Sequence, residues 1–172
     1  MTSEIAEHDH TLRTWHALVL LIGLWAIIFL PYLGHGEFKG EEGRRVLPAV
    51  EMLRHGRWML PRIGGEDYYN KPPGINWIVA ASFALTGQQN EWSARLPSAL
   101  AVLALGVLIV CQLRFLALQT RLAAAIVFLT NIGMMEKGRL IEIEAIYACA
   151  TGMAIVCWLS AWVEGRSSVR VW

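Results

Sequence analysis

The stretch PPGINWIVAASFALTG, residues 72–87, decides how this chain folds, because it is apolar but short for a membrane crossing. As a helix it would extend about 24 Å at 1.5 Å per residue, against a hydrocarbon core of about 30 Å. A first helical turn tolerates the proline pair, and Gly87 stands where a helix would stop. Trp77 is typical of a membrane interface. We therefore predict that residues 72–87 form a helix lying at the membrane surface.

Outward from this segment, long runs of the chain carry no charge. Residues 17–33, 96–113 and 145–163 are uncharged over 17, 18 and 19 residues, and residues 122–135 over 14. A membrane-spanning helix needs about 17–25 predominantly apolar residues. Of the 172 residues, 55% are hydrophobic and 17% are charged, whereas about 25% are charged in soluble domains. This pattern excludes a soluble single-core domain, a disordered chain and a secreted disulfide scaffold, and it predicts an all-α polytopic membrane protein.

We expect one transmembrane domain over residues 1–172, with about four spans and a long first external loop. The loop covers residues 35–93 and carries amphipathic juxtamembrane helices at about 45–55 and 72–87. The first apolar run is expected to stay as an anchor, because no small-residue cleavage site follows it. The spans are expected at about residues 15–34, 94–115, 121–137 and 142–163.

A noncrossing helix at 72–87 determines on which side the loops lie. It places the polar segments 34–71 and 136–144 on the same side of the membrane. Segment 34–71 holds seven Lys/Arg and six acidic residues. Its basic residues weigh against an external position, because Lys and Arg prefer the cytoplasmic side. The co-location of the two segments does not depend on which side they face. We expect both to face the periplasm or exterior of a cell inner membrane. Five arginines then gather on the other side, as the positive-inside rule prefers: Arg13, Arg114, Arg121, Arg166 and Arg170.

Net charge and cysteine use narrow the expected partners. The formal net charge is +1, so nothing points to nucleic acid, and membrane lipids are the expected surroundings. Three cysteines lie inside apolar runs, where they behave as small hydrophobes and predict no disulfide or zinc framework: Cys111, Cys149 and Cys157.

The first loop opens with adjacent carboxylates, Glu41 and Glu42, followed by adjacent guanidinium groups, Arg44 and Arg45. Apolar residues then recur at helical spacing, which predicts a short amphipathic helix that ends at Gly56. Pro48 is acceptable only in a first turn, so the helix is expected to start near 45–47, with its apolar face on the membrane. The alternative is a surface helix whose charges are only solvated.

Two further clusters follow along the chain. Gly64 and Gly65 predict a turn, Tyr68 and Tyr69 supply hydroxyls, and Lys71 stands where it would meet a lipid phosphate or simply snorkel. The second cluster lies between apolar runs, where ionisable groups near the hydrocarbon suggest function and a plain short loop is the alternative. There Arg139 and Glu142 are spaced to pair on a helix. Its five charged residues are Glu136, Lys137, Arg139, Glu142 and Glu144.

Together these clusters carry a family resemblance over about residues 25–163. Four motifs follow one another in the chain: E-E-G-R-R, A-V-E-M-L-R-H-G-R-W-M-L-P-R, G-G-E-D-Y-Y-N-K-P-P-G-I-N-W and A-R-L-P-S-A-L. Their order resembles the N-terminal part of fold-C (GT-C) glycosyltransferases. The chain is most similar to the lipid A aminoarabinose transferases and the bacterial relatives of protein O-mannosyltransferases. The resemblance implies a membrane enzyme that moves a sugar from a polyprenyl-phosphate donor to a lipid or protein acceptor outside the cytoplasm.

The resemblance also implies roles for individual residues. The family's acidic pair, usually Asp-Glu, matches Glu41 as catalytic base and Glu42 beside it, which is expected to orient Arg44 or Arg45. The acid of the second external loop matches Glu144, with Glu142 close by. The family's arginine three residues after the acid matches Arg44, and the lysine before its proline pair, which approaches the donor phosphate, matches Lys71. From their residue types and positions, Arg44 and Arg139 are also expected to bind the donor phosphate, and Tyr68, Tyr69 and Glu142 are expected to line the substrate path.

The expected chemistry fits these residue types. A carboxylate takes the proton of an attacking acceptor hydroxyl, and cations neutralise the charge that develops on the departing phosphate. No cofactor is certain. Some relatives bind a divalent metal through an acid before the lysine, and this chain has Asn70 there.

Length leaves alternatives open, because family members are much longer than this chain. It is expected to be a fragment, a truncated product, or a half that needs a C-terminal part or partner chain. Two rival classes are a non-catalytic membrane protein that binds lipid phosphate through Lys71, and a small transporter subunit. The transporter hypothesis requires residues 72–87 to span, with Glu142 and Glu144 lining a pore.

Overall fold

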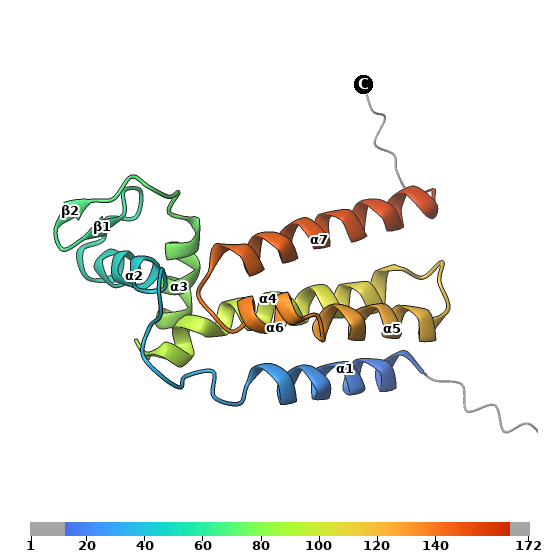
Figure 1. Ribbon diagram of the computed structural model, residues 1–172. Helices are drawn as coiled ribbons and strands as arrows, with labels where there is room; N and C mark the ends of the chain where they lie inside the picture. Colours follow the sequence, from blue (N-terminus) through green and yellow to red (C-terminus); the bar gives the residue numbers. More distant parts are fainter. Residues whose placement is uncertain (1–12, 166–172) are drawn as a thin grey trace, which may run out of the picture.

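A computed structural model describes residues 13–165, which are mostly helical (Figure 1). This confirms the mainly α-helical class predicted from the sequence, with one small antiparallel hairpin added. The described elements are α1 (Thr14–Phe29), α2 (Gly43–His55), β1 (Arg62–Ile63), β2 (Glu66–Asp67), α3 (Gly74–Thr86), α4 (Glu91–Gln112), α5 (Leu118–Leu129), α6 (Ile132–Lys137) and α7 (Ile143–Val163).

Four helices, α1, α4, α5 and α7, lie lengthwise beside one another, and α4 contacts the other three. Their shared core is apolar, as expected for helices whose solvent-free faces must pack together. Leu21, Phe29, Val102 and Leu129 are fully buried in it. Figure 1 shows α2, the hairpin and α3 gathered at one end of this bundle, while the α4–α5 connection lies at the other.

The number of spans is supported only in part. Within residues 13–165, α4 and α7 are long and apolar enough to cross a membrane, with 22 and 21 residues. Helices α1 and α5 have only 16 and 12 residues, or about 24 and 18 Å at 1.5 Å per residue. Two candidate spans are therefore observed, and four remain a prediction.

The continuous helix predicted over residues 121–137 is wrong. Helix α5 ends at Leu129, and Asn131 begins the separate helix α6 by accepting hydrogen bonds from the backbone N–H groups of Gly133 and Met134. An asparagine side chain that caps a new helix competes with continuation of the old one. The polar break at Thr130 and Asn131 therefore turns the chain before the charged cluster begins.

The helix predicted at 72–87 is present as α3, which ends at Gly87 in a left-handed conformation with φ of 67°. It is 13 residues long and stands across the direction of the bundle (Figure 1). Its buried side packs against α2 and α4 through Ile75, Val79 and Phe83. The transporter hypothesis requires this segment to span alongside the others, whereas α3 stands across the direction of the four bundle helices.

Helix α2 differs from the prediction in two respects. It begins at Gly43, so Pro48 lies inside the helix and not in its first turn. Its apolar side, with Val46, Ala49 and Met52 buried, is covered by α3 within the protein. The expectation that this face lies on the membrane surface is therefore wrong, because α3 already covers it.

A proline in α4 links it to α3. Pro97 has no N–H, so the carbonyl of Ser93, four residues earlier, loses its helical donor. The hydroxyl of Ser82 on α3 donates to that carbonyl at 2.5 Å. An interior proline therefore becomes an attachment point for the crossing helix.

The arrangement predicts the accessibility of three positions in a chain whose native cysteines are replaced by alanine. Single cysteines at Glu66 in the hairpin and at Glu136 in α6 should both react with an impermeant thiol reagent from outside, since the hairpin and α6 lie toward the α3 end of the bundle. A cysteine at Thr120, at the other end, should react only after permeabilisation. Labelling of Glu66 and Glu136 from opposite faces would contradict the fold. Of the arginines expected on the inner face, Arg166 and Arg170 lie outside the described residues.

Candidate functional site

The site is organised by a buried carboxylate, Glu42, which is fully excluded from solvent. The guanidinium of Arg95 binds it through two parallel hydrogen bonds, from Nε to Oε1 and from Nη2 to Oε2, each 2.9 Å long. Backbone N–H groups of Lys39 and Ile141 donate to the same carboxylate at 2.8 and 3.0 Å. Glu42 thus accepts four hydrogen bonds, which is about the full capacity of a carboxylate.

Arg95 is equally saturated. Besides Glu42, its Nη atoms donate to the backbone carbonyls of Leu33, His35 and Glu37. All five N–H groups of the guanidinium therefore donate a hydrogen bond. Arg95 is only 3% exposed, and a charged group removed from water is stable only when its donors are paired. The bonded carbonyls belong to the segment between α1 and α2, so Arg95 shapes the path of the first loop.

The hydrogen bond from Ile141 brings the second polar segment against the first. Gly138 in that segment lies so close to the bundle that a Cβ atom there would meet Phe29 and Val102 at 2.8 and 2.9 Å. The two predicted loops therefore meet at one end of the bundle. This confirms their expected co-location.

The prediction that Glu42 orients Arg44 or Arg45 is wrong, because its carboxylate binds Arg95 instead. Burial by itself would raise the pKa of the Glu42 carboxyl, but the hydrogen bonds from Arg95, Lys39 and Ile141 outweigh it and hold the pKa below its ordinary value. A carboxylate with every acceptor position occupied has no lone pair left for a substrate proton. Its geometry is that of an anchor, and the catalytic role expected for it has no support here.

Glu41 is the available member of the acidic pair, with its side chain 50% exposed. Arg44 Nη1 donates to its Oε1 at 2.7 Å, and Arg45 Nη2 lies 3.8 Å from its Oε2. Arg44 is itself exposed, whereas the Arg45 side chain is only 6% exposed. Glu41 therefore presents a carboxylate to solvent with guanidinium groups on one side.

Lys71 precedes α3, is exposed, and makes no hydrogen bond or ion pair within residues 13–165. A mainly apolar groove of about 490 Å³ runs between α3 and α7, and the first residue of its lining, Gly74, follows Lys71 by three positions in the chain. The indole N–H of Trp77, in the groove wall, donates to the carbonyl of Trp58 at 2.7 Å and fixes that wall. The remaining lining residues are Ile75, Ile78, Ala81, Ile143, Ile146, Tyr147 and Ala150.

The second cluster pairs differently from the prediction. Glu142 binds Lys137 Nζ at 2.7 Å, not Arg139, and this pair raises the pKa of the lysine. Arg139 donates through Nη2 to the carbonyl of Pro31 and lines a cavity separate from the groove beside Lys71. Glu144 is exposed in the first turn of α7, next to the groove residue Ile143.

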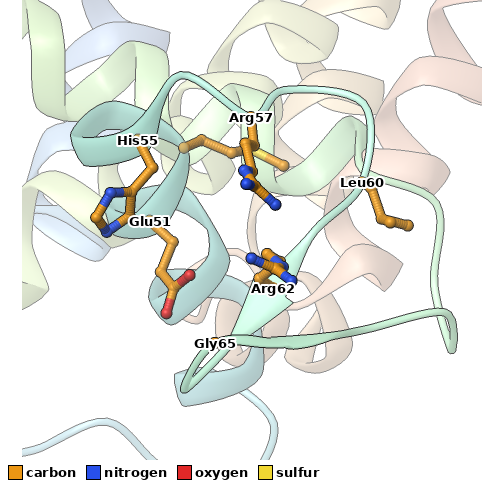
Figure 2. A pocket seen from close by; sticks show the side chains of 7 residues that line it. Glu51, His55, Arg57, Leu60, Arg62 and Gly65 are labelled. Atoms are coloured by element: carbon orange, nitrogen blue, oxygen red, sulfur yellow. The ribbon is translucent and has the colours of Figure 1, made fainter.

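A further polar pocket of about 420 Å³ lies between α2 and the hairpin. Figure 2 shows Glu51 and His55 on α2 facing Arg57 and Arg62. Arg62 is bound by Asp67 at 2.6 Å, and this ion pair lowers the pKa of Asp67. The predicted turn at Gly64–Gly65 is confirmed, with φ of 62° and 86°. The pocket was missed from the sequence, because two-residue strands give no periodic signal.

The predicted tyrosines adjoin this hairpin. The Tyr69 hydroxyl donates to Asp67 at 3.3 Å, and its ring is 75% exposed. Tyr68 is half-buried, and its backbone N–H donates to Pro61. Neither hydroxyl contacts Glu41 or Lys71.

Within residues 13–165, protein side chains alone do not form a divalent-metal site. Across residues 13–165, no three His, Cys, Asp or Glu side chains gather where they would hold one ion. Asn70, where some relatives carry an acid, leaves Lys71 without a neighbouring carboxylate ligand. No step of the chemistry below uses a metal.

Arg95 was the important residue not identified as functional. The signal available was a charge at the start of an apolar run, which demands a partner when the run is buried. Its partner lies 53 residues away, and no local spacing reveals such a separation.

Comparison with known proteins agrees with the resemblance seen in the sequence. The profile of the family described as dolichyl-phosphate-mannose-protein mannosyltransferase matches residues 70–172. That segment includes Lys71, Arg95, Arg139 and Glu144, whereas Glu41 precedes it.

Several curated relatives carry the name undecaprenyl phosphate-alpha-4-amino-4-deoxy-L-arabinose arabinosyl transferase. Two from Pseudomonas fluorescens are 33% and 35% identical over 56% and 52% of this chain, and each match covers 16% of the relative. One from Pectobacterium carotovorum is 31% identical over 66% of this chain and 21% of the relative. The chain thus matches only about a sixth to a fifth of these proteins' length. No solved structure matches it.

The anchor predicts a sharp contrast between adjacent carboxylates. Glu42→Gln leaves the Arg95 charge buried without a counter-ion and should cost about 3–5 kcal/mol of unfolding free energy. Glu41→Gln removes an exposed pair and should cost less than about 1 kcal/mol. Replacing Glu42 and Arg95 together by methionine should cost less than the sum of the single replacements. Denaturation of the detergent-solubilised variants measures all three, and equal losses at Glu41 and Glu42 would refute the anchor.

The lowered pKa of Glu42 predicts the pH dependence of stability. The ionised pair stabilises the fold fully above the unfolded-state value of about 4.3. That contribution should be lost as pH falls through the lower pKa of the folded state. Thermal unfolding from pH 7 to pH 3 should show this acid loss in the parent chain. In Glu42→Gln the loss should be smaller; an identical profile would mean that other carboxylates cause it.

Proposed function

Because the chain belongs to the dolichyl-phosphate-mannose-protein mannosyltransferase family, we propose that it forms part of a membrane glycosyltransferase. The proposed reaction moves a sugar from a polyprenyl-phosphate donor to a lipid or protein acceptor on the external face of the inner membrane. The names of the relatives support this donor class. Since the match covers little of their length, the rest of the catalytic domain would come from a C-terminal continuation or a partner chain.

One observation carries the proposal: Glu41 is held open to solvent while Glu42, the next residue, is locked in place by Arg95. An acceptor hydroxyl within about 3 Å of Glu41 would lose its proton to the carboxylate as it attacks the anomeric carbon. Arg44, hydrogen-bonded to one carboxylate oxygen, keeps the base oriented and leaves the second oxygen for the proton.

The donor would occupy the groove beside Lys71. The leaving phosphate needs a cation to neutralise its developing charge, and the unpaired ammonium of Lys71 supports that role. A polyprenyl tail is apolar, and the groove between α3 and α7 is lined almost wholly by apolar side chains. Arg44 is the second candidate for the phosphate, since it is exposed and only partly engaged by Glu41.

The remaining roles follow from position. Glu144, exposed beside the groove wall, is proposed as the second acidic residue of the site. Glu142 is engaged by Lys137, so we propose that it supports the loop, with Tyr68 and Tyr69 lining the substrate path from the hairpin side.

Non-catalytic binding of lipid phosphate is the second candidate, favoured by the same groove and the same unpaired lysine. The two differ in what Glu41 does. Binding alone requires Lys71 and the groove, whereas transfer also requires the exposed carboxylate.

Substitutions in the chain joined to its C-terminal continuation, or complemented by a partner, test the proposal. Glu41→Gln should lower transfer about 10²–10⁴-fold with donor binding nearly unchanged, because only the base is lost. Lys71→Ala should weaken donor binding and raise the donor concentration required. Radiolabelled sugar transfer and donor-binding assays measure the two effects.

Glu37→Gln is the matched control, since Glu37 is an exposed carboxylate of the same loop and should transfer at the parent rate. Parent activity in Glu41→Gln would exclude Glu41 as base. If the parent and every variant except Lys71→Ala bind the donor but none of them transfers sugar, the non-catalytic alternative is favoured.

A further inference from the structure

A third cavity, of about 400 Å³, lies between the two loops at the end of α1. We call it the interloop cavity. It is separate from the groove beside Lys71, and no part of the transfer reaction proposed above uses it. Its lining residues are Tyr32, Leu33, His35, Lys39, Arg95, Met135, Glu136, Arg139 and Leu140.

The interloop cavity has an excess of positive charge. Arg95 is neutralised by Glu42, but the ammonium of Lys39 has no ion-pair partner among the described residues. Arg139 uses one N–H on the Pro31 carbonyl, and no carboxylate lies within 4 Å of its guanidinium in the described chain. The one acid in the lining, Glu136, is 63% exposed and lies 3.6 Å from Lys137.

The rim of this cavity is apolar and strained. Tyr32 is the one non-glycine residue in residues 13–165 with positive φ, at 58°, and its ring is 78% exposed. Strain of this kind persists where surrounding structure enforces it and often accompanies binding sites. Met135 is also exposed. Exposed aromatic and apolar groups at the end of apolar helices are typical of a membrane interface, where lipid phosphates lie.

We propose that the interloop cavity binds the phosphate of an anionic lipid headgroup, with Lys39 and Arg139 as its cationic ligands. A guanidinium fork and an ammonium suit the tetrahedral oxygens of a phosphate. The apolar rim contacts the glycerol and the first carbons of the lipid. Glu136 opposes the anion and limits its affinity. This site requires neither sugar transfer nor the donor groove.

Calorimetric titration of the purified chain in nonionic detergent tests the proposal. Every protein carries Lys71→Met, which removes the donor-phosphate contact proposed above, so failure of either proposal is seen separately. The probes are dihexanoyl phosphatidic acid and inorganic phosphate. Lys39→Met should weaken phosphatidic acid binding about tenfold, and Glu136→Gln should tighten it about threefold. Arg54→Met, which removes an exposed charge outside the cavity, is the matched control and should change nothing.

The outcomes separate clearly. Binding of phosphatidic acid much tighter than inorganic phosphate, and lost with Lys39, establishes a headgroup site. Equal binding of both probes would establish the anion site but overturn the lipid assignment. Absence of binding, or equal losses in Lys39→Met and Arg54→Met, would overturn the site itself. Glu136→Gln keeps the test decisive if Lys39→Met fails to fold.

Discussion

The ion pair between Glu42 and Arg95 is the constraint on which the rest of this end of the protein depends. Both charges are almost wholly removed from water, which is tolerable only when every donor and acceptor finds a partner. Those partners come from the segment after α1, from the start of α4 and from the segment before α7. The hydrogen bonds that this pair of charges requires therefore hold three parts of the chain together. If one of these parts moved away, the buried charges would lose partners and the contacts of the other two parts would weaken.

The pair also explains how two consecutive glutamates take different roles. Adjacent residues at a helix start point in directions about 100° apart, so one can face the core while the other faces solvent. Glu42 faces inward and anchors; Glu41 faces outward beside Arg44. An immobile neighbour keeps the position of an exposed carboxylate well defined, which general-base chemistry needs. A single dipeptide thus supplies both a stabilising interaction and the exposed carboxylate that we propose as the base.

Several local features of this fold were readable from the sequence, whereas the partners of its charged side chains were not. The helix at α3, its end at Gly87 and the turn at Gly64–Gly65 followed from short-range rules of proline, glycine and apolar spacing. The partner of Glu42 and the partner of Glu142 did not, because ion pairing depends on three-dimensional proximity that spacing alone does not encode. The apolar face of α2 was assigned to the membrane because the sequence cannot show that α3 covers it.

The depth of the ion pair connects the fold to the proposed chemistry. Arg95 is the fifth residue of α4, so it lies about 6 Å along that helix from its start. A 22-residue helix extends about 33 Å, close to the thickness of the hydrocarbon core. The pair would then lie near the boundary where apolar chains give way to headgroups. A polyprenyl-phosphate donor has its apolar tail in the hydrocarbon core and its phosphate at that boundary. An anchor at this depth would hold Glu41 at the level where the proposed lipid-borne sugar is presented, which a loop fixed farther from the membrane could not do.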